Sequence, residues 1–430
     1  MGRALFTAVT GLKAQQTKLD IVANNIANVN TTGYRSSRIL FQDLFSQTLS
    51  GPSAPAGQFG GTNPRQVGLG VQVASIDVNH GQGSLVTTGI NSDLAIQGNG
   101  FFILSDGLTS VYTRDGSFTI NSVGTLIDPA TGLRVQGYTA SPAGVIDAVN
   151  TIPGDITIPL GQAGFASATT EAEIVGNLNA RTRDGEFVVR NIEVFDSLGT
   201  ARNVELTFTK TPNPNEWTWE ATFDNGGGPA TVGSGTLTFD TDGTVQAGSE
   251  TGAISITAAD LGSEPTMPVD PLAITLDFST ITQLTPPVDP AADPAAQPPS
   301  NITLNSQDGF PLGVLQSFSI GANGQIIGVF TNDRTRVIAQ VALAAFANVG
   351  GLTREGNNAF RQSPASGLAQ IGTPGTGGRG SVNGGVLESS NVDLGTEFSE
   401  LIITQRAFQA NSRTITAADT LLQEAVNLVR

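Results

Sequence analysis

Apolar residues recur at alternating spacings of three and four positions at both ends of the chain. This spacing places one apolar stripe along one side of an α-helix. The N-terminal stripe consists of Leu5, Ala8, Leu12, Gln15, Leu19, Val22, Ile26 and Val29. The C-terminal stripe, widened by two further apolar residues, consists of Leu394, Phe398, Leu401, Gln405, Phe408, Ser412, Ile415, Asp419, Leu422, Val426 and Val429, with Ile402 and Leu421. The sequence therefore predicts two amphipathic terminal helices, the first from about residue 4 to 30 and ended by the Asn-Thr-Thr-Gly run at 30–33.

The apolar stripes of the two helices must pack against another surface, and the sequence allows two alternatives for that surface. The helices can pair with each other inside one core, which is the general rule for amphipathic helices. They can also pack against other copies of the chain. If the two chain ends lie together, antiparallel pairing places Gln15 opposite Thr416 and Gln405 opposite Ile26. The polar residues of the two stripes then do not meet, so contacts between chains stay an alternative.

The chain between the terminal stripes is predicted to be β-structure. Short alternating runs are separated by Gly, Asn, Asp and Pro, which is typical of strands joined by tight turns. A weak repeat occurs at residues 117–120, 237–239 and 317–320, where each apolar run precedes a glycine and a second apolar run. Each copy predicts a strand, a turn and a strand. The predicted fold is mainly β, with the two long helices forming a coiled-coil-like layer.

The composition agrees with this fold class. Of 430 residues, 39% are hydrophobic and 13% charged, with 52 Gly and 22 Pro, which suits a turn-rich β-protein better than a helical bundle or a disordered chain. The chain has no Cys, so disulfides, thiolate metal sites and cysteine nucleophiles are excluded. No apolar run approaches the ~20 residues that span a bilayer, and residues 1–18 are polar where a signal peptide is apolar. We expect neither membrane insertion nor a cleaved secretion signal.

The net charge of −16 is carried by one part of the chain. Residues 145–300 contain 21 acidic and five basic residues, whereas the other 274 residues contain 16 of each. The 274 residues without excess charge are suited to packing, whereas the acidic insert at 145–300 is suited to contact with solvent. Nucleic acid is not an expected partner of an acidic chain. A proline-rich run at 286–299 predicts an extended connector, and a run rich in glycine and serine at 372–385 predicts a flexible joint.

These boundaries predict a nested organisation, in which it stays open whether the insert forms one domain or two. The predicted parts are a terminal helical assembly domain (1–67 with 388–430), a middle β domain (68–144 with 301–387) and an inserted acidic outer β domain (145–300).

Few residues are candidates for chemistry. His80 is the only histidine and precedes a Gly-Gln-Gly-Ser run, so we expect a solvated histidine in a loop or turn. None of the three lysines follows a Gly-rich turn, which excludes a phosphate loop. The Asp-Thr-Asp-Gly run at 240–243 lacks the later ligands of a calcium loop and predicts a hairpin turn. We predict no catalytic, cofactor-binding or metal-binding residues, and no enzyme.

Two tryptophans are the basis of an alternative prediction, which belongs to another functional class. Trp217 and Trp219 flank Thr218 and so share one face of a strand, where they form either part of a sheet core or a platform for a ligand. With nearby acidic residues, the platform predicts a secreted carbohydrate-active or sugar-binding β-protein. That alternative leaves both heptad ends unexplained.

Four stretches of the chain resemble the flagellar rod and hook family. They are residues 12–34, with the run Val-Ala-Asn-Asn-Ile-Ala-Asn-Val-Asn-Thr-Thr-Gly-Tyr, and the shorter motifs at 94–102, 112–118 and 405–411. Asn24 and Asn28 lie on one helical face, where their amides can fix the register of packed helices. The insert matches less closely, through residues 194–199 and Trp217. Because rod subunits are expected to lack such an insert, it favours the hook branch, with a distal rod subunit as the alternative.

The resemblance implies a structural subunit, without cofactors, that forms a flexible tubular joint transmitting torque from rod to filament on the bacterial flagellum. It implies a homopolymer whose further partners are the distal rod protein, the hook-filament junction protein, the hook cap and the flagellar export apparatus, and an extracellular location. Terminal helices are expected to line the tube, with the β region as its wall and the insert outside. The residues expected to carry self-assembly are Leu5, Leu12, Leu19, Val22, Asn24, Asn25, Ile26, Asn28, Val29, Leu394, Phe398, Leu401, Gln405, Phe408, Ile415, Leu422 and Val426.

Overall fold

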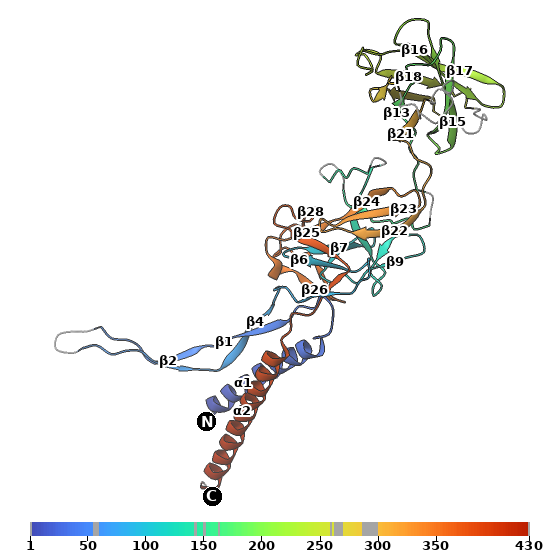
Figure 1. The fold of residues 1–430 in the computed structure, drawn as a ribbon. Coiled ribbons are helices and arrows are strands. Elements are labelled where there is room, and N and C mark those ends of the chain that lie inside the picture. The colour runs from blue at the N-terminus through green and yellow to red at the C-terminus, as the bar shows by residue number, and fades with distance from the viewer. Residues whose placement is uncertain are drawn as a thin grey trace, which may run out of the picture. The chain divides into compact units, whose positions relative to one another are not determined.

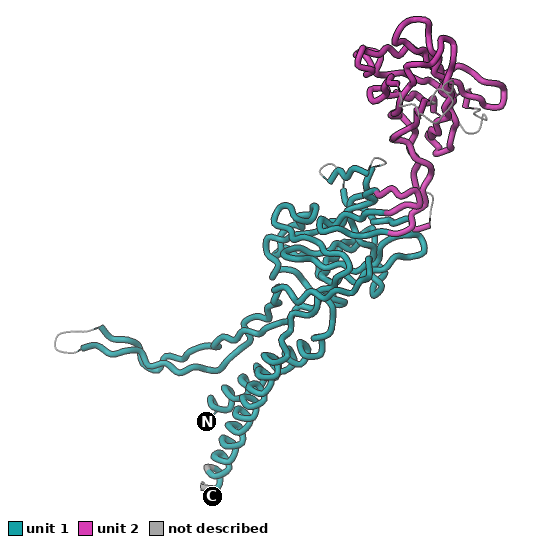
Figure 2. The backbone as a smooth tube through the Cα atoms, viewed as in Figure 1, with its two compact units in different colours: residues 1–159, 318–328, 336–430 teal, residues 160–317, 329–335 magenta. Residues whose placement is uncertain are grey.

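The computed structural model of the chain describes residues 2–54, 60–141, 144–148, 152–161, 164–258, 260–261, 270–285 and 300–428. These form two compact units (Figure 2). Unit 1 comprises Met1–Pro159, Phe318–Gly328 and Arg336–Arg430, and unit 2 comprises Leu160–Ser317 and Val329–Thr335. The predicted fold class is confirmed: one long helix lies at each end of the chain, and the regular elements described between them are strands, apart from one 3-10 turn. The proline-rich run at 286–299 lies outside the described residues.

The two terminal helices belong to unit 1 (Figure 1). Helix α1 (Gly2–Ala27) ends three residues earlier than the sequence predicts, and the left-handed residue Gly33 follows it with φ 66°. A Cβ atom at Gly33 would lie 2.6 Å from the backbone nitrogen of Asp115, so both the backbone angle and the space require glycine. Helix α2 (Leu394–Leu428) begins after Asp393, whose carboxylate accepts hydrogen bonds from the backbone N–H of Gly395 and Thr396.

A two-stranded arm follows α1. Strand β1 (Ser37–Asp43) pairs antiparallel with β4 (Val71–Val78), and further out β2 (Ser46–Ser50) pairs antiparallel with β3 (Arg65–Gly68). We call these four strands the arm (Figure 1). Because each pair forms a sheet of only two strands, the outer edges of the arm have no further strand hydrogen-bonded to them within the described chain.

A 13-stranded sheet provides the main framework of unit 1. Its main path runs in the order β22 (Leu315–Ile320), β23 (Gln325–Phe330), β24 (Thr335–Val341), β11 (Arg134–Thr139), β7 (Phe101–Ser105), β8 (Ser110–Thr113), β27 (Ala359–Arg361) and β26 (Thr353–Gly356). Shorter strands pair with β11, with β7 or with one another: β9 (Thr119–Ile120), β10 (Leu126–Ile127), β12 (Gly154–Asp155), β25 (Leu343–Ala345) and β28 (Gln370–Gly372). The 3-10 turn η1 (Val349–Gly351) follows β25.

The glycine-rich run at 372–385 is not a flexible joint, which corrects the prediction. It contains β29 (Ser381–Gly384), which pairs with β6 (Leu94–Gln97), and it leads into β30 (Val386–Glu388), which pairs with β5 (Leu85–Thr87). A Cβ atom at Gly380 would lie 2.2 Å from the carbonyl oxygen of Gln97. The glycines in this run therefore permit close backbone approach.

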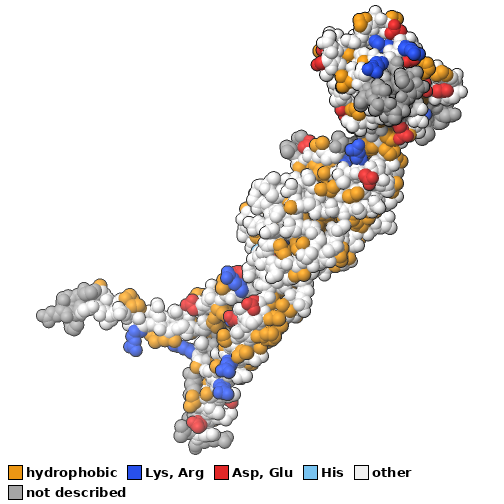
Figure 3. All heavy atoms as spheres, viewed as in Figure 1, with side chains coloured by type: hydrophobic (Ala, Val, Ile, Leu, Met, Phe, Trp, Pro, Cys, Tyr) orange, Lys and Arg blue, Asp and Glu red, His pale blue; other side chains and the backbone are white. Residues whose placement is uncertain are grey.

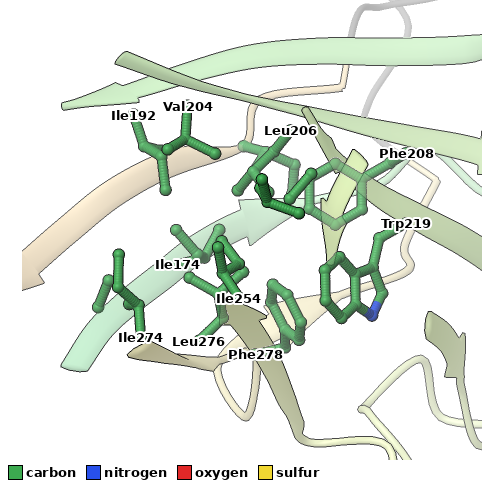
Figure 4. Close-up of a cluster of buried hydrophobic side chains, with 14 of the residues drawn as sticks. Ile174, Ile192, Val204, Leu206, Phe208, Trp219, Ile254, Ile274, Leu276 and Phe278 are labelled. Carbon is green, nitrogen blue, oxygen red and sulfur yellow. The ribbon is translucent and has the colours of Figure 1, made fainter. Parts of the chain in front are cut away.

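Unit 2 contains two packed sheets. One has five strands in the order β18 (Thr251–Ile256), β19 (Leu272–Asp277), β13 (Glu171–Asn177) and β20 (Ile281–Thr282), with β21 (Thr303–Gln307) beside β13. The other has the order β14 (Phe187–Phe195), β15 (Ala201–Lys210), β16 (Glu216–Asp224) and β17 (Pro229–Thr238). Figure 4 shows side chains of the two sheets meeting in one hydrophobic core, among them Phe208 and Phe278.

The tryptophans of unit 2 are core residues. Trp217 is 0% exposed and Trp219 is 3% exposed, and both belong to the hydrophobic cluster between the sheets. The Trp219 ring centroid lies 5.4 Å from that of Phe278. The sheet-core interpretation is confirmed, and the ligand platform, on which the carbohydrate alternative rests, is wrong.

The three predicted hairpins are all present. Residues 119–127 form β9, a turn and β10; residues 315–330 form β22, a turn and β23; and Phe239 forms an isolated bridge with Val245 after β17. Each turn contains a glycine with positive φ: Gly124 (87°), Gly243 (84°) and Gly324 (70°). The Asp-Thr-Asp-Gly run at 240–243 is thus a hairpin turn, as the sequence predicts.

Candidate functional site

The contact between α1 and α2 is made by small and polar side chains. The residues that α1 buries are Ala8, Gly11, Ala14, Val22 and Asn25. On α2 the buried residues are Thr404 and Ala418. A Cβ atom at Gly11 would lie 2.9 Å from the side-chain nitrogen of Asn411, so the two helices are in close contact at this point. Small residues allow helix backbones to approach without leaving room for large apolar side chains between them.

Three pairs of residues define the antiparallel register of the helices. Gly11 lies beside Asn411, Lys18 forms an ion pair with Glu400, and the side-chain amide of Asn25 donates to Glu397 at 3.0 Å. The register obtained by aligning the two chain ends, with Gln15 opposite Thr416, is therefore wrong. Helix α2 extends beyond the start of α1 in this register.

Many large apolar side chains of the helices are exposed. Figure 3 shows hydrophobic side chains gathered over the part of unit 1 that contains the helix pair. We call the following set the outer face of the helix pair: Phe6 (55% exposed), Val9, Leu394, Phe398 (50%), Ile402 (52%), Ile403 (60%), Phe408, Leu421, Leu422 and Val426. The pairing of the helices within one chain thus leaves these large apolar side chains exposed to solvent.

The residues predicted to carry self-assembly fall into three groups by exposure. Two are buried, namely Val22 and Asn25. Eight are half-buried: Leu5, Leu12, Leu19, Ile26, Asn28, Val29, Leu401 and Ile415. Seven are exposed: Asn24, Leu394, Phe398, Gln405, Phe408, Leu422 and Val426. Six of the seven exposed residues lie on α2.

The predicted stripes omit the small-residue contact and part of the outer face. Gly11, Ala14, Thr404 and Asn411 carry no weight in a pattern of large apolar residues. The series of Ala8, Gly11 and Ala14 has a spacing of three, which is a readable signal for a close helix contact. The outer-face residues that the stripes omit are Phe6, Val9 and Ile403.

Asn25 joins α1, the arm and α2. Its side chain is 1% exposed and takes part in four hydrogen bonds. The amide nitrogen donates to the carbonyl oxygen of Ser37 (2.8 Å) and to Glu397, while the amide oxygen accepts from the Tyr34 hydroxyl (3.2 Å) and the Ser37 N–H (3.0 Å). Asn24 and Asn28, by contrast, bond to each other at 2.7 Å. The amide that links the two helices is therefore that of Asn25.

The Glu397 carboxyl sits in an acidic environment at this junction. Burial raises its pKa above the usual value, and the nearby carboxylates of Glu400 and Asp393 raise it further. The hydrogen bond from Asn25 opposes the shift, because it favours the ionised form.

A buried ion triad links the N-terminal segment, the sheet and the C-terminal segment. Arg35 Nη2 lies 2.9 Å from one carboxylate oxygen of Glu388, and Arg114 Nη1 lies 3.3 Å from the other. The side chains are 1%, 5% and 0% exposed for Arg35, Arg114 and Glu388. Glu388 also accepts a hydrogen bond from the Gly83 N–H at 2.8 Å. We call these three charged residues the triad.

His80 is the only histidine, and its position differs from the expected solvated one. It lies in a loop, as predicted, but it is half-buried, with its ring centroid 6.1 Å from that of Phe101 and 5.6 Å from that of Phe360. Burial lowers the pKa of His80 to about 4, and the positive charges of Arg35, Arg354 and Arg114 contribute to this shift. The side chain is therefore neutral at physiological pH.

Metal-binding clusters and membrane spans are both missing from the described part of the chain. No group of three or more His, Cys, Asp or Glu side chains among those residues is arranged to hold a metal ion. None of the described helices is long and apolar enough to cross a membrane.

Comparisons with known proteins place the chain in a family. Four family models match: Flagella basal body rod protein (residues 5–35), Flagellar hook protein FlgE/F/G D1 domain (95–175), Flagellar basal body protein FlaE D2 domain (165–310) and Flagellar basal body rod FlgEFG protein C-terminal (383–428). The chain is 38% identical over 476 residues to Flagellar hook protein FlgE of Treponema pallidum, and 39% identical over 450 residues to the same protein of Borreliella burgdorferi. Both alignments cover 100% of each chain. The chain belongs to the flagellar hook protein family.

The family models match several parts of this hook subunit. The rod and C-terminal models match α1, α2 and the residues around Asn25, and the D2 model covers most of the acidic insert that residue motifs matched only loosely. Among solved structures, the crystal structure of Helicobacter pylori flagellar hook protein FlgE2 is similar at 14% identity and a TM-score of 0.45, over 69% of this chain and 99% of that one.

Proposed function

We propose that this hook subunit has a structural rather than a catalytic role and assembles with copies of itself through the outer face of its helix pair. The observation that carries the proposal is that small side chains are buried where α1 contacts α2, whereas many large apolar side chains of both helices are exposed. Phe398 and Ile402 are each at least half exposed, although burying such a side chain contributes about 1.5–3 kcal/mol. Large exposed apolar side chains in this number on one helix pair are typical of a protein-protein contact.

The arm supports a second contact surface. Along its strands Leu40 (43% exposed), Phe45 (75%), Leu49 (57%) and Ile76 (52%) meet solvent. A two-stranded ribbon is only marginally stable without a covering layer. On this proposal a neighbouring copy supplies that layer with its helix pair, and because such a contact joins two different patches, it propagates a helical polymer and does not close a dimer.

The finer role follows the family and remains part of the proposal. Residues 1–67 with 388–430 form the assembly layer, 68–144 with 301–387 the middle wall, and 145–300 the outer domain. The polymer is a flexible tube that transmits torque from rod to filament. The subunit reaches its extracellular site through the flagellar export apparatus, without a cleaved signal. Its partners besides itself are the distal rod protein, the hook-filament junction protein and the hook cap.

The test uses the full-length chain with two exposed residues of α2 changed together, Phe398→Ser and Ile402→Ser. Losing two buried side chains at each contact is expected to raise the critical concentration for assembly by more than about 100-fold, measured by sedimentation with electron microscopy of the pellet. The matched control is Phe187→Ser, because Phe187 is 66% exposed and lies in unit 2. Equal critical concentrations for the double variant and the control would contradict the proposal.

Substitutions are a sharper test than deletion of the chain ends. A deletion of residues 1–70 removes Arg35 and leaves the buried carboxylate of Glu388 with one arginine fewer. Such a variant could lose assembly because unit 1 is destabilised and not because a contact surface is missing.

A further inference from the structure

A small cavity of about 210 Å³ lies where the loop after α1 meets the β26–β27 hairpin. The run at 22–34 that carries the family resemblance supplies part of its wall through Asn28, Gly33 and Tyr34. The hairpin supplies Arg354, Phe360 and the amide side chains of two asparagines, Asn357 and Asn358. The volume suits one small polar group with a few water molecules, and is below that of pockets for drug-sized ligands.

The cavity is lined by positive charge without a negative one. Arg35 and Arg354 are the charged side chains among the described residues that line it, in a chain whose net charge is −16. The Arg354 guanidinium lies 5.4 Å from the ring centroid of Tyr34 and donates at 3.1 Å to the Ser37 hydroxyl, so its position is fixed. Planar guanidinium groups held in this way are suited to bind carboxylates and other oxyanions.

The surrounding cluster has more cations than anions. Arg35 and Arg114 share the single carboxylate of Glu388, and Arg354 donates to the carbonyl oxygen of Arg35. Arg35 is 1% exposed, and its Nε–H finds no hydrogen-bond partner among the described residues. Buried donors on a charged group are normally satisfied, so the positive charge of this cluster is not fully compensated by the protein itself.

We infer that the cavity is an anion site that takes a carboxylate or a similar small oxyanion beside the Arg354 guanidinium, in the positive potential of the buried Arg35. The anion comes either from solution or from an Asp or Glu side chain of a second copy, and the latter source rests on the proposed assembly. Either source supplies the negative charge that the cluster lacks.

The NMR signals of His80 can report whether an anion occupies the cavity. It is the only histidine of the chain, so the histidine region of an NMR spectrum contains one set of signals. Its ring lies 5.6 Å from that of Phe360, which lines the cavity, and its pKa of about 4 partly reflects the same arginines. An anion beside Arg35 and Arg354 cancels part of their potential, so it moves the His80 pKa upward.

The experiment titrates the full-length monomer with sodium sulfate, and with sodium chloride at matched ionic strength. Sulfate is expected to shift the His80 signals saturably and to raise the His80 pKa. Arg354→Gln is expected to weaken this response about tenfold or more, whereas Arg354→Lys retains part of it. The control is Arg361→Gln, whose side chain is 52% exposed and pairs with Glu355. Circular dichroism of each variant checks that the fold is intact.

The outcomes separate the inference from the proposed function. The anion site is overturned if sulfate and chloride act equally at matched ionic strength, or if folded Arg354→Gln responds like the control. If the sulfate response is present and Arg354→Gln also raises the critical concentration for assembly above that of Arg361→Gln, the occupant is a carboxylate of a second copy. If the response is present and assembly is unchanged, the occupant is a free anion, and the site stands whether or not the helices mediate assembly.

Discussion

Replacing Glu388 by Gln should destabilise unit 1 without affecting unit 2. The substitution removes the only carboxylate of the triad and leaves the guanidinium groups of Arg35 and Arg114 buried, with side chains 1% and 5% exposed. Breaking a buried ion pair in this way costs about 3–5 kcal/mol, and we expect about 3, because the Gln oxygen can still accept a hydrogen bond from the Gly83 N–H. This is a large fraction of the roughly 5–15 kcal/mol of a typical domain.

The chain offers separate probes for its two units. The long helices α1 and α2 belong to unit 1, so far-ultraviolet circular dichroism reports mainly on that unit. Trp217 and Trp219 are the only tryptophans of the chain and belong to the core of unit 2, so their fluorescence reports on that unit. In a urea titration, Glu388→Gln should lower the midpoint of the helical transition and leave that of the fluorescence transition unchanged.

The matched control for this experiment is Glu355→Gln. Glu355 pairs with Arg361 at 2.7 Å, but both side chains are about one third to one half exposed, so the loss should be below about 1 kcal/mol. If Glu388→Gln and Glu355→Gln shift the helical transition equally, the triad does not hold unit 1 together. An equal shift of the tryptophan transition would contradict the assignment of the effect to unit 1.

Two further predictions concern the helix contact and pH. At Gly11 a Cβ atom would lie 2.9 Å from the Asn411 side chain, so Gly11→Val should destabilise the helix pair by about 1–3 kcal/mol in thermal denaturation, whereas Gly2→Ala, with nothing within 4 Å, should not. The His80 pKa falls from 6.5 to about 4 on folding, so below pH 6.5 the unfolded chain binds a proton that the folded chain does not. Stability should therefore fall between pH 6.5 and about 4, by about 1–2 kcal/mol after allowance for partial exposure, and His80→Gln should remove this part of the slope in urea titrations at several pH values.

Features set by local sequence could be predicted. The spacing of three and four identified both terminal helices, because an α-helix has about 3.6 residues per turn. The hairpins at Gly124, Gly243 and Gly324 were identified because their turns need positive φ, which glycine adopts without strain. That Trp217 and Trp219 share one face followed from alternation along one strand, and the structure shows that this face is buried.

Features set by partners distant in sequence were missed. The helix register depends on Gly11 and Asn411, which are small or polar and carry no signal in a hydrophobic pattern. The run at 372–385 was interpreted as flexible because glycine serves equally for mobile linkers and for close backbone contacts, and only the neighbouring Gln97 carbonyl distinguishes the two. The triad could not be predicted either, because nothing local marks Glu388 as the partner of two arginines that lie far upstream.

The triad also sets an order of events during synthesis. Arg35 and Arg114 leave the ribosome early, but their counter-charge at Glu388 is encoded in the last tenth of the chain. Until that residue emerges, burying the two guanidinium groups is strongly unfavourable, so the region around them has to stay hydrated and loosely packed. A chain that ends before Glu388 therefore cannot complete unit 1, and closure of this part of the molecule requires that the polypeptide has been made at least as far as Glu388.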